Sequence, residues 1–138
     1  MTRILVAVND SPAGLAAART AVRLAAETRG TVLAVHVVGQ YAVHHTVGGP
    51  APEGSDHRSG AVLTYVEELA ARDGVELAAV LLPGVPARVI LDQAAAWGAE
   101  MIVLGRSGVR HVGQPFVGSQ VLHVIEFTEV PVLVVPAA

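Results

Sequence analysis

The sequence predicts an α/β protein with a single open, five-stranded parallel sheet and helices on both of its faces. Two observations carry this prediction. Short apolar runs rich in valine and leucine alternate along the chain with longer segments whose apolar residues recur at helical spacing. The chain has 138 residues, the usual length of one domain, which we take to span residues 1–138.

The first strand and the first helix are expected between Arg3 and Gly30. Arg3 to Val8 is a short apolar run with β-branched residues, which is typical of a strand buried on both faces. Ser11 is a good N-cap and Pro12 suits a first helical turn, so the helix is expected to begin there. Gly30 is expected to end it. Its inward face is formed by Leu15, Ala18, Val22 and Ala25.

A strand, a loop and a second helix are expected next. Thr31 to Val38 is another apolar run. Residues 39–60 contain many glycines and prolines without a regular period, so we expect a long loop there. Ala61 to Arg72 has helical spacing and is followed by Gly74. The inward face of this helix consists of Val62, Tyr65, Val66 and Leu69.

The rest of the chain continues the alternation. Val75 to Leu82 is the third expected strand, and a helix is expected from Pro86 to Gly98. Met101 to Leu104 and Val130 to Val135 are the last two strands, with a helix over Ser119 to Phe127 between them. Strands and helices that alternate in this way are joined by right-handed crossovers, as in Rossmann-like folds.

A ligand site is expected beyond the carboxyl ends of the strands, because open parallel sheets bind ligands where their strand order reverses. Three segments would meet there. They are Val8-Asn9-Asp10, Val35 to Val38, and the glycine-rich stretch that follows Leu104.

This glycine-rich stretch reads Gly105-Arg106-Ser107-Gly108, then nine residues, then Gly118-Ser119. It lies between an expected strand and an expected helix. Glycines let the backbone approach an anion, and the N–H groups of a helix start can bind it. The stretch therefore predicts a phosphate site, and hence a nucleotide. The alternative is a set of turn glycines that binds no ligand.

These residues resemble the universal stress protein family, in its ATP-binding branch. The family motif is glycine, two residues, glycine, nine residues, then glycine and serine or threonine, and the chain matches it without a spacing error. The flanking strands are similar as well, so that the resemblance spans nearly the whole chain except residues 39–60.

The resemblance implies a site for ATP, or for AMP or ADP, with Mg²⁺ bridging phosphate oxygens. Its residues can be grouped by the part of the nucleotide that each would contact. Ala7 and Leu104 would line the base pocket, and the Val37 backbone would contact the adenine edge. Asn9 and Gly105 would hold the ribose. The phosphates would be surrounded by Gly108, Gly118, Ser119 and Gln120, with Arg106 and Arg110 as further candidates.

The chain departs from the family pattern at two places. Asn9 stands where the family usually has aspartate, and a neutral amide makes a weaker hydrogen bond to a ribose hydroxyl than a carboxylate does. His111 to Phe116 replaces a stretch that is often basic and leucine-rich, and Pro115 within it removes an N–H group and stiffens the loop.

Composition excludes several function classes. The chain has no cysteine, which excludes disulfides and thiolate metal sites and fits a cytoplasmic protein. It has no lysine, and so neither a P-loop lysine nor a Schiff base. A net charge of −3 gives no reason to expect a nucleic-acid partner. No apolar run approaches the roughly 20 residues that span a bilayer, so no membrane partner is expected.

No set of residues in the sequence demands catalysis. Asp10 and His111 are the candidates for a slow ATPase or phosphoryl-transfer enzyme, which would need a group to orient the attacking water. His44 and His45 point in opposite directions on an extended chain and do not form a metal site together. His36 is expected to be a buried, hydrogen-bonded histidine.

The sequence thus favours a regulatory module in which ATP occupancy modulates a stress response. The other readings are a nucleotide-free dimerisation or scaffold module and a slow ATPase. In the strand order 3-2-1-4-5, Val132 to Val135 would lie at a sheet edge, where an apolar strand needs a partner. The family resemblance implies a homodimer that pairs antiparallel through this strand.

Overall fold

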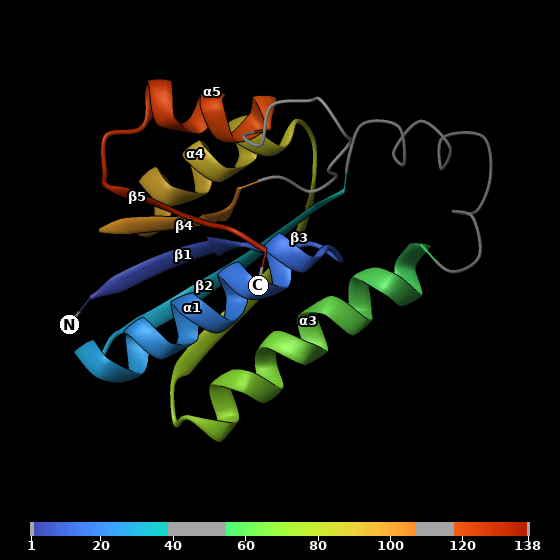
Figure 1. Ribbon diagram of the computed structural model, residues 1–138, viewed down its shortest axis with the longest axis vertical. Coiled ribbons are helices and arrows are strands. Elements are labelled where there is room, and N and C mark those ends of the chain that lie inside the picture. Colours follow the sequence, from blue (N-terminus) through green and yellow to red (C-terminus); the bar gives the residue numbers. More distant parts are fainter. Residues whose placement is uncertain (1, 39–54, 107–117, 138) are drawn as a thin grey trace.

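The structure, a computed structural model, describes residues 2–38, 55–106 and 118–137, with only the backbone of residues 55–59. Strands and helices alternate along these residues (Figure 1). The strands are β1 (Arg3–Ala7), β2 (Thr31–Val38), β3 (Glu76–Pro83), β4 (Met101–Gly105) and β5 (Val132–Val135). The helices are α1 (Pro12–Thr28), α3 (Ser55–Arg72), α4 (Pro86–Trp97) and α5 (Ser119–Phe127).

The strands form one five-stranded sheet in the order β3-β2-β1-β4-β5, and every neighbouring pair is parallel. This confirms the predicted topology. The chain moves outward from β1 through β2 to β3, then returns to the other side of β1 for β4 and β5. The strand order therefore reverses between β1 and β4, which places the expected ligand crevice at their carboxyl ends.

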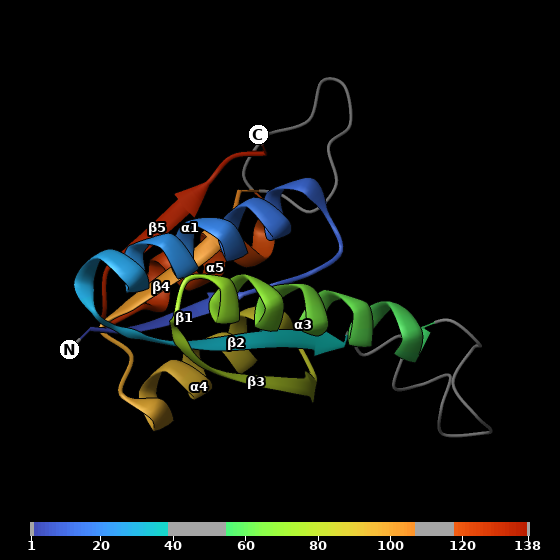
Figure 2. The ribbon, with the colours of Figure 1, turned by 90° about the horizontal axis from the view of Figure 1, so that it is seen from below.

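Helices cover both faces of the sheet. Figures 1 and 2 show α1 and α3 on one face and α4 and α5 on the other. α1 packs mainly on β1 and β4, while α3 packs on β2 and β3. α4 and α5 pack against each other as well as on the sheet.

Two apolar cores lie on the two faces, because successive strand residues point to opposite sides. Ile4 and Val6 of β1 point toward α1 and α3, whereas Leu5 points toward α4 and α5. The side of α1 that meets the sheet is made almost entirely of small residues, including Ala17, Ala18, Ala21 and Ala25, all fully buried. These small side chains let α1 lie close to the sheet. Leu15, which was expected on this face, is only half-buried.

The end of α1 differs from the expectation that Gly30 stops the helix. The helix ends at Thr28, and its C-cap is Arg29, which adopts a left-handed conformation with φ of 55°. Gly30 has another role: a Cβ at this position would lie 2.3 Å from the carbonyl oxygen of Thr2. Glycine is needed there because the chain passes close to the start of β1.

The expectation of a loop over residues 39–60 was wrong in its last part, because α3 begins at Ser55. Gly60 lies inside the helix and is exposed, and apart from the helix's own backbone no atom of the described side chains and loops lies within 4 Å of a Cβ built on it. Val62, Val66 and Ala70 anchor the helix in the core, and its first turns extend beyond this packed part. Residues 39–54 lie outside the described residues.

Some strands also begin or end at other residues than the sequence predicts. β1 ends at Ala7 and not at Val8, β3 is shifted by one residue, and β5 begins at Val132 and not at Val130. β4 continues through Gly105. Within the described ranges, no helix is long and apolar enough to cross a membrane.

Candidate functional site

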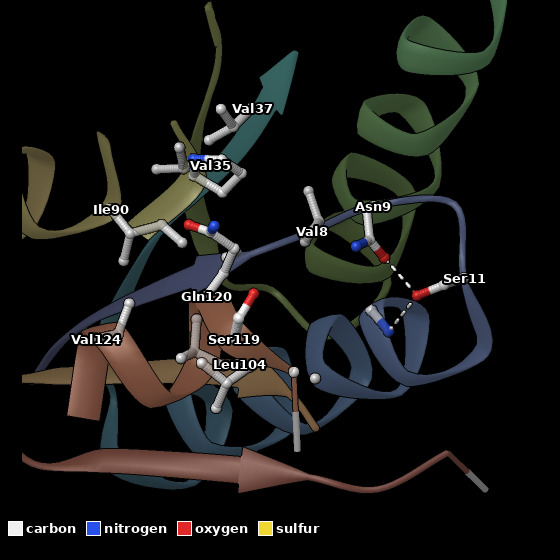
Figure 3. A pocket seen from close by; sticks show the side chains of 16 residues that line it. Val8, Asn9, Ser11, Val35, Val37, Ile90, Leu104, Ser119, Gln120 and Val124 are labelled. Carbon is white, nitrogen blue, oxygen red and sulfur yellow. Dashed lines mark hydrogen bonds between the residues drawn. The ribbon is translucent and has the colours of Figure 1, made fainter. Parts of the chain in front are cut away.

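A cavity of about 370 Å³ opens at the carboxyl ends of β1, β2 and β4 (Figure 3). It lies at the predicted reversal of the strand order. Eight of the eleven residues proposed from the sequence line it, namely Ala7, Asn9, Val37, Leu104, Gly105, Gly118, Ser119 and Gln120. Val8 and Val35, from segments that were expected at this crevice, also line it. The sequence did not indicate the remaining lining residues, which are Ser11, Gly14, Pro86, Ile90, Val121 and Val124.

The other three proposed residues are Arg106, Gly108 and Arg110. Arg106 is half-buried and follows β4 directly, and its backbone N–H donates to the carbonyl of Val135 at 2.8 Å. Gly108 lies outside the described residues, as do Arg110, His111, Pro115, His44 and His45. Asp10 is exposed and does not line the cavity.

The wall of the cavity is largely apolar. Val35 and Val37 come from β2, Leu104 from β4 and Ile90 from α4, and α5 adds Val121 and Val124. Figure 3 shows side chains from these different elements around the same space. An apolar cavity with a few polar groups at its rim suits a flat, partly apolar ligand. Helical spacing places the inward residues of α4 and α5 here, but the sequence alone did not show which of them reach the cavity.

The loop after β1 is held by a short hydrogen-bond relay. Ser11 is the N-cap of α1, and its hydroxyl oxygen accepts the N–H of Gly14 at 3.0 Å. The same hydroxyl donates its proton to Oδ1 of Asn9, at 2.5 Å. A Cβ on Gly14 would lie only 2.0 Å from that Asn9 oxygen. Glycine at position 14 therefore makes room for the Asn9 side chain beside the helix start.

The hydrogen-bonded ladder between β1 and β2 ends before it reaches Val37, which lines the cavity. Ala7 pairs with Val35, and the N–H of Val8 donates to the Val35 carbonyl at 2.9 Å. A regular parallel ladder would continue with a bond from the Val37 N–H to the Val8 carbonyl. That carbonyl instead accepts from Nδ1 of His36, at 2.7 Å. His36 was expected to be a buried, hydrogen-bonded histidine. It makes this hydrogen bond among its interactions, but it is only half-buried.

The end of β4 lies against the first turn of α1. A Cβ on Gly105 would lie 2.7 to 2.9 Å from backbone atoms of Ala13 and Gly14. The chain returns to this point at Gly118, whose N–H donates to the carbonyl of Arg106 at 3.0 Å. α5 begins at the next residue, Ser119. The first N–H groups of an α-helix have no acceptor within the helix and attract negative charge. The rim of the cavity therefore includes a helix N-terminus.

Gln120 has a structural contact that the sequence did not indicate. Its Oε1 accepts the backbone N–H of Ala87 at 2.9 Å. Ala87 lies in the first turn of α4, whose N-cap residue Val85 provides no side-chain hydrogen bond. Gln120 thus caps α4 from α5 and joins the two helices at the mouth of the cavity.

The expected magnesium ion has no protein cluster of its own in the described part of the chain. No three residues among His, Cys, Asp and Glu come together there.

Comparison with known proteins identifies the family. A model described as "Universal stress protein family" matches residues 1–136. The chain is 33% identical to Universal stress protein MJ0531 of Methanocaldococcus jannaschii over 141 aligned residues, which cover 96% of this chain and 81% of that protein.

Solved structures show the same fold. The hypothetical protein MJ0577 superposes with a TM-score of 0.79 at 20% identity, over 99% of this chain and 96% of that one. A universal stress protein in complex with cAMP gives 0.74 at 17% identity, over 99% and 98% of the two chains. The universal stress protein of Archaeoglobus fulgidus in complex with dAMP gives 0.72 at 23% identity, over 98% of each chain. The chain therefore belongs to the universal stress protein family.

Proposed function

We propose that this protein is a cytoplasmic, homodimeric regulatory module that binds ATP, or AMP or ADP, in the cavity at the carboxyl ends of β1, β2 and β4. Nucleotide occupancy would modulate its part in a stress response. The observation that carries the proposal is the meeting of an apolar slot and a helix N-terminus in one cavity. A base suits the slot, and phosphates suit the helix start.

The position of Val37 supports an adenine base. Its peptide groups face the side on which the β1 ladder has ended, so its N–H can donate to a ring nitrogen and its carbonyl can accept from an exocyclic amine. Val35 and Leu104 line the same space with apolar side chains. The neighbours that bind cAMP and dAMP have this fold, which also supports an adenine nucleotide.

Gly118 and Ser119 are the described residues best placed for the phosphates. Both line the cavity, and both lie at the start of α5. Mg²⁺ would enter with the nucleotide and bridge its phosphate oxygens. Because Gln120 ties α5 to α4, a phosphate held at the start of α5 would also stabilise the position of α4. This coupling is the simplest way in which occupancy could change the surface that a partner meets.

Calorimetric titration of the purified protein with ATP and with AMP, in the presence of Mg²⁺, tests the proposal. We expect saturable binding, and we expect nucleotide to be released from denatured protein. A ligand that binds only the folded state at a hundred times its dissociation constant stabilises it by about 2.7 kcal/mol, so the melting temperature should rise as well. Absence of heat and of thermal shift at millimolar ATP would favour the nucleotide-free scaffold.

Two glycine variants make the test specific to the cavity. Gly118→Val should fold, since the nearest atom to a Cβ there, among the residues that the structure describes, is the carbonyl oxygen of Arg106 at 3.9 Å. It should weaken ATP binding about tenfold or more, because it adds a branched side chain beside the phosphate position. Gly60→Val is the matched control, because Gly60 is exposed on α3 and does not line the cavity.

The homodimer is proposed through β5, at the edge of the sheet. This strand pairs with β4 on one side, and Leu133 within it is 37% exposed. An apolar edge strand invites pairing with a second copy. Light scattering on a size-exclusion column should give about twice the chain mass of 14.2 kDa. A single monomeric peak at micromolar concentration would rule out this part of the proposal.

A further inference from the structure

Asn9 has a fixed orientation in this chain, and that orientation determines which ligand atoms it can recognise. Its amide has one acceptor oxygen and one donor NH₂ group. Ser11 sits on the oxygen side, at 2.5 Å from Oδ1. The Asn9 oxygen therefore faces Ser11, and the amide NH₂ group is turned away from it (Figure 3).

The rest of the relay supports the same assignment. The Ser11 oxygen accepts the N–H of Gly14 at 3.0 Å, and the Ser11 hydroxyl donates its proton to Oδ1 of Asn9. The Asn9 oxygen lies beside Gly14, at a place that any Cβ would occupy. Figure 3 shows the Asn9 oxygen turned toward Ser11 and the amide nitrogen on the side of the cavity.

We propose that Asn9 is a specificity-determining residue whose side chain presents only hydrogen-bond donors to the ligand. The cavity therefore accepts nucleotides in which the sugar oxygen beside Asn9 can accept a hydrogen bond but not donate one, as in a 2′- or 3′-ether or ester. An aspartate at this position would present acceptors and would need a free hydroxyl proton on the sugar. This inference rests on the proposed nucleotide-binding function and refines its substrate class.

The reason lies in the chemistry of the sugar hydroxyl. A free hydroxyl both donates and accepts, so it can bond to either side chain. Methylation of the oxygen removes the donor but keeps the acceptor. A methyl ether can therefore still accept from the Asn9 amide, whereas it has no proton for a carboxylate. Asparagine and aspartate have nearly the same shape, so any steric effect of the methyl group should be common to both.

The test is calorimetric titration of the wild-type protein and Asn9→Asp with ATP, 2′-O-methyl-ATP and 3′-O-methyl-ATP, all with Mg²⁺. The quantity compared is the dissociation constant of each ether divided by that of ATP in the same protein. For the sugar oxygen that Asn9 contacts, we expect this ratio to be below about 3 in the wild type. In Asn9→Asp we expect it to be at least tenfold higher, because the ether has lost roughly one hydrogen bond to a charged group. Equal ratios in the two proteins at both positions would overturn the inference.

Two further variants separate orientation from charge. In Ser11→Ala the amide can rotate its oxygen toward the ligand, so the ratio should rise toward that of Asn9→Asp, and an unchanged ratio contradicts the role of Ser11. Asp10→Asn is the matched control: it changes an exposed neighbouring charge outside the cavity lining and should leave the ratio as in the wild type. The titration with ATP itself reports on the proposed function. If the wild type binds ATP but the ether-to-ATP ratios are the same in the wild type and Asn9→Asp, only the donor role of Asn9 is disproved.

Discussion

The side-chain oxygen of Gln120, in the first turn of α5, accepts the backbone N–H of Ala87, in the first turn of α4, at 2.9 Å. The two residues are 33 positions apart in the sequence. Ile90 and Val124, from the two helices joined in this way, both line the cavity. This hydrogen bond therefore joins the N-termini of the two helices that carry Ile90 and Val124 to the cavity.

Removal of this bond should cost stability and nucleotide affinity together. Gln120→Ala leaves the start of α4 without its side-chain cap, and we expect a loss of about 1 kcal/mol in the free energy of unfolding. Gln120→Glu keeps an acceptor, with a charge that suits a helix N-terminus, so it should retain stability while it repels ATP. Urea unfolding and calorimetry measure the two effects. Gln93→Ala, half-buried on α4, is the control, and an equal loss there would contradict the cap.

Gly14 should show the reverse of the usual helix preference. Glycine to alanine inside a helix normally stabilises by about 0.5–1 kcal/mol. A Cβ at Gly14 would meet Asn9 Oδ1 at 2.0 Å and the Asn9 carbonyl at 2.8 Å, so Gly14→Ala must displace the loop. We expect a destabilisation of about 1–3 kcal/mol and a loss of ATP binding.

Gly60→Ala is the comparison for that variant. The position is helical and exposed, and outside its own helix backbone no described atom lies within 4 Å of a Cβ, so the variant should gain the usual fraction of a kcal/mol. Denaturant midpoints for both variants measure the difference. If Gly14→Ala is as stable as Gly60→Ala, the packing of Asn9 against the helix start is not as the structure has it.

His36 should control access to the Val37 backbone. Its ring N–H holds the Val8 carbonyl, to which the Val37 N–H would otherwise donate in a continued ladder. In His36→Phe we expect that ladder bond to form, which slows amide exchange at Val37 and weakens ATP binding by roughly tenfold, the value of about one hydrogen bond. His36→Gln keeps a donor and should recover part of the affinity. Unchanged exchange at Val37 in His36→Phe would count against this role.

The sequence predicts the strand order and the place of the cavity well, because both follow from patterns that are local or general. Alternating apolar runs indicate the sheet, and the reversal of strand order follows from it. The relations of Gln120 with Ala87 and of Gly105 with Ala13 depend on how distant helices and strands approach one another, which no local pattern encodes. For the same reason no local pattern indicates the role of Gly14, which is visible only when the Asn9 side chain is in place.

The end of α1 departs from the rule that a glycine provides the left-handed cap of a helix. Arg29 occupies the cap, with φ of 55°. The neighbouring Gly30 is needed because a side chain there would meet the backbone of Thr2. A left-handed residue other than glycine costs about 1–2 kcal/mol, so Arg29→Gly should raise the free energy of unfolding by about 1 kcal/mol. Arg23→Gly, at an exposed site within the same helix, should lower it by about 1 kcal/mol. Both variants lose one arginine, so charge cannot account for opposite signs in urea unfolding. Two changes of the same sign would show that α1 does not end at a left-handed Arg29.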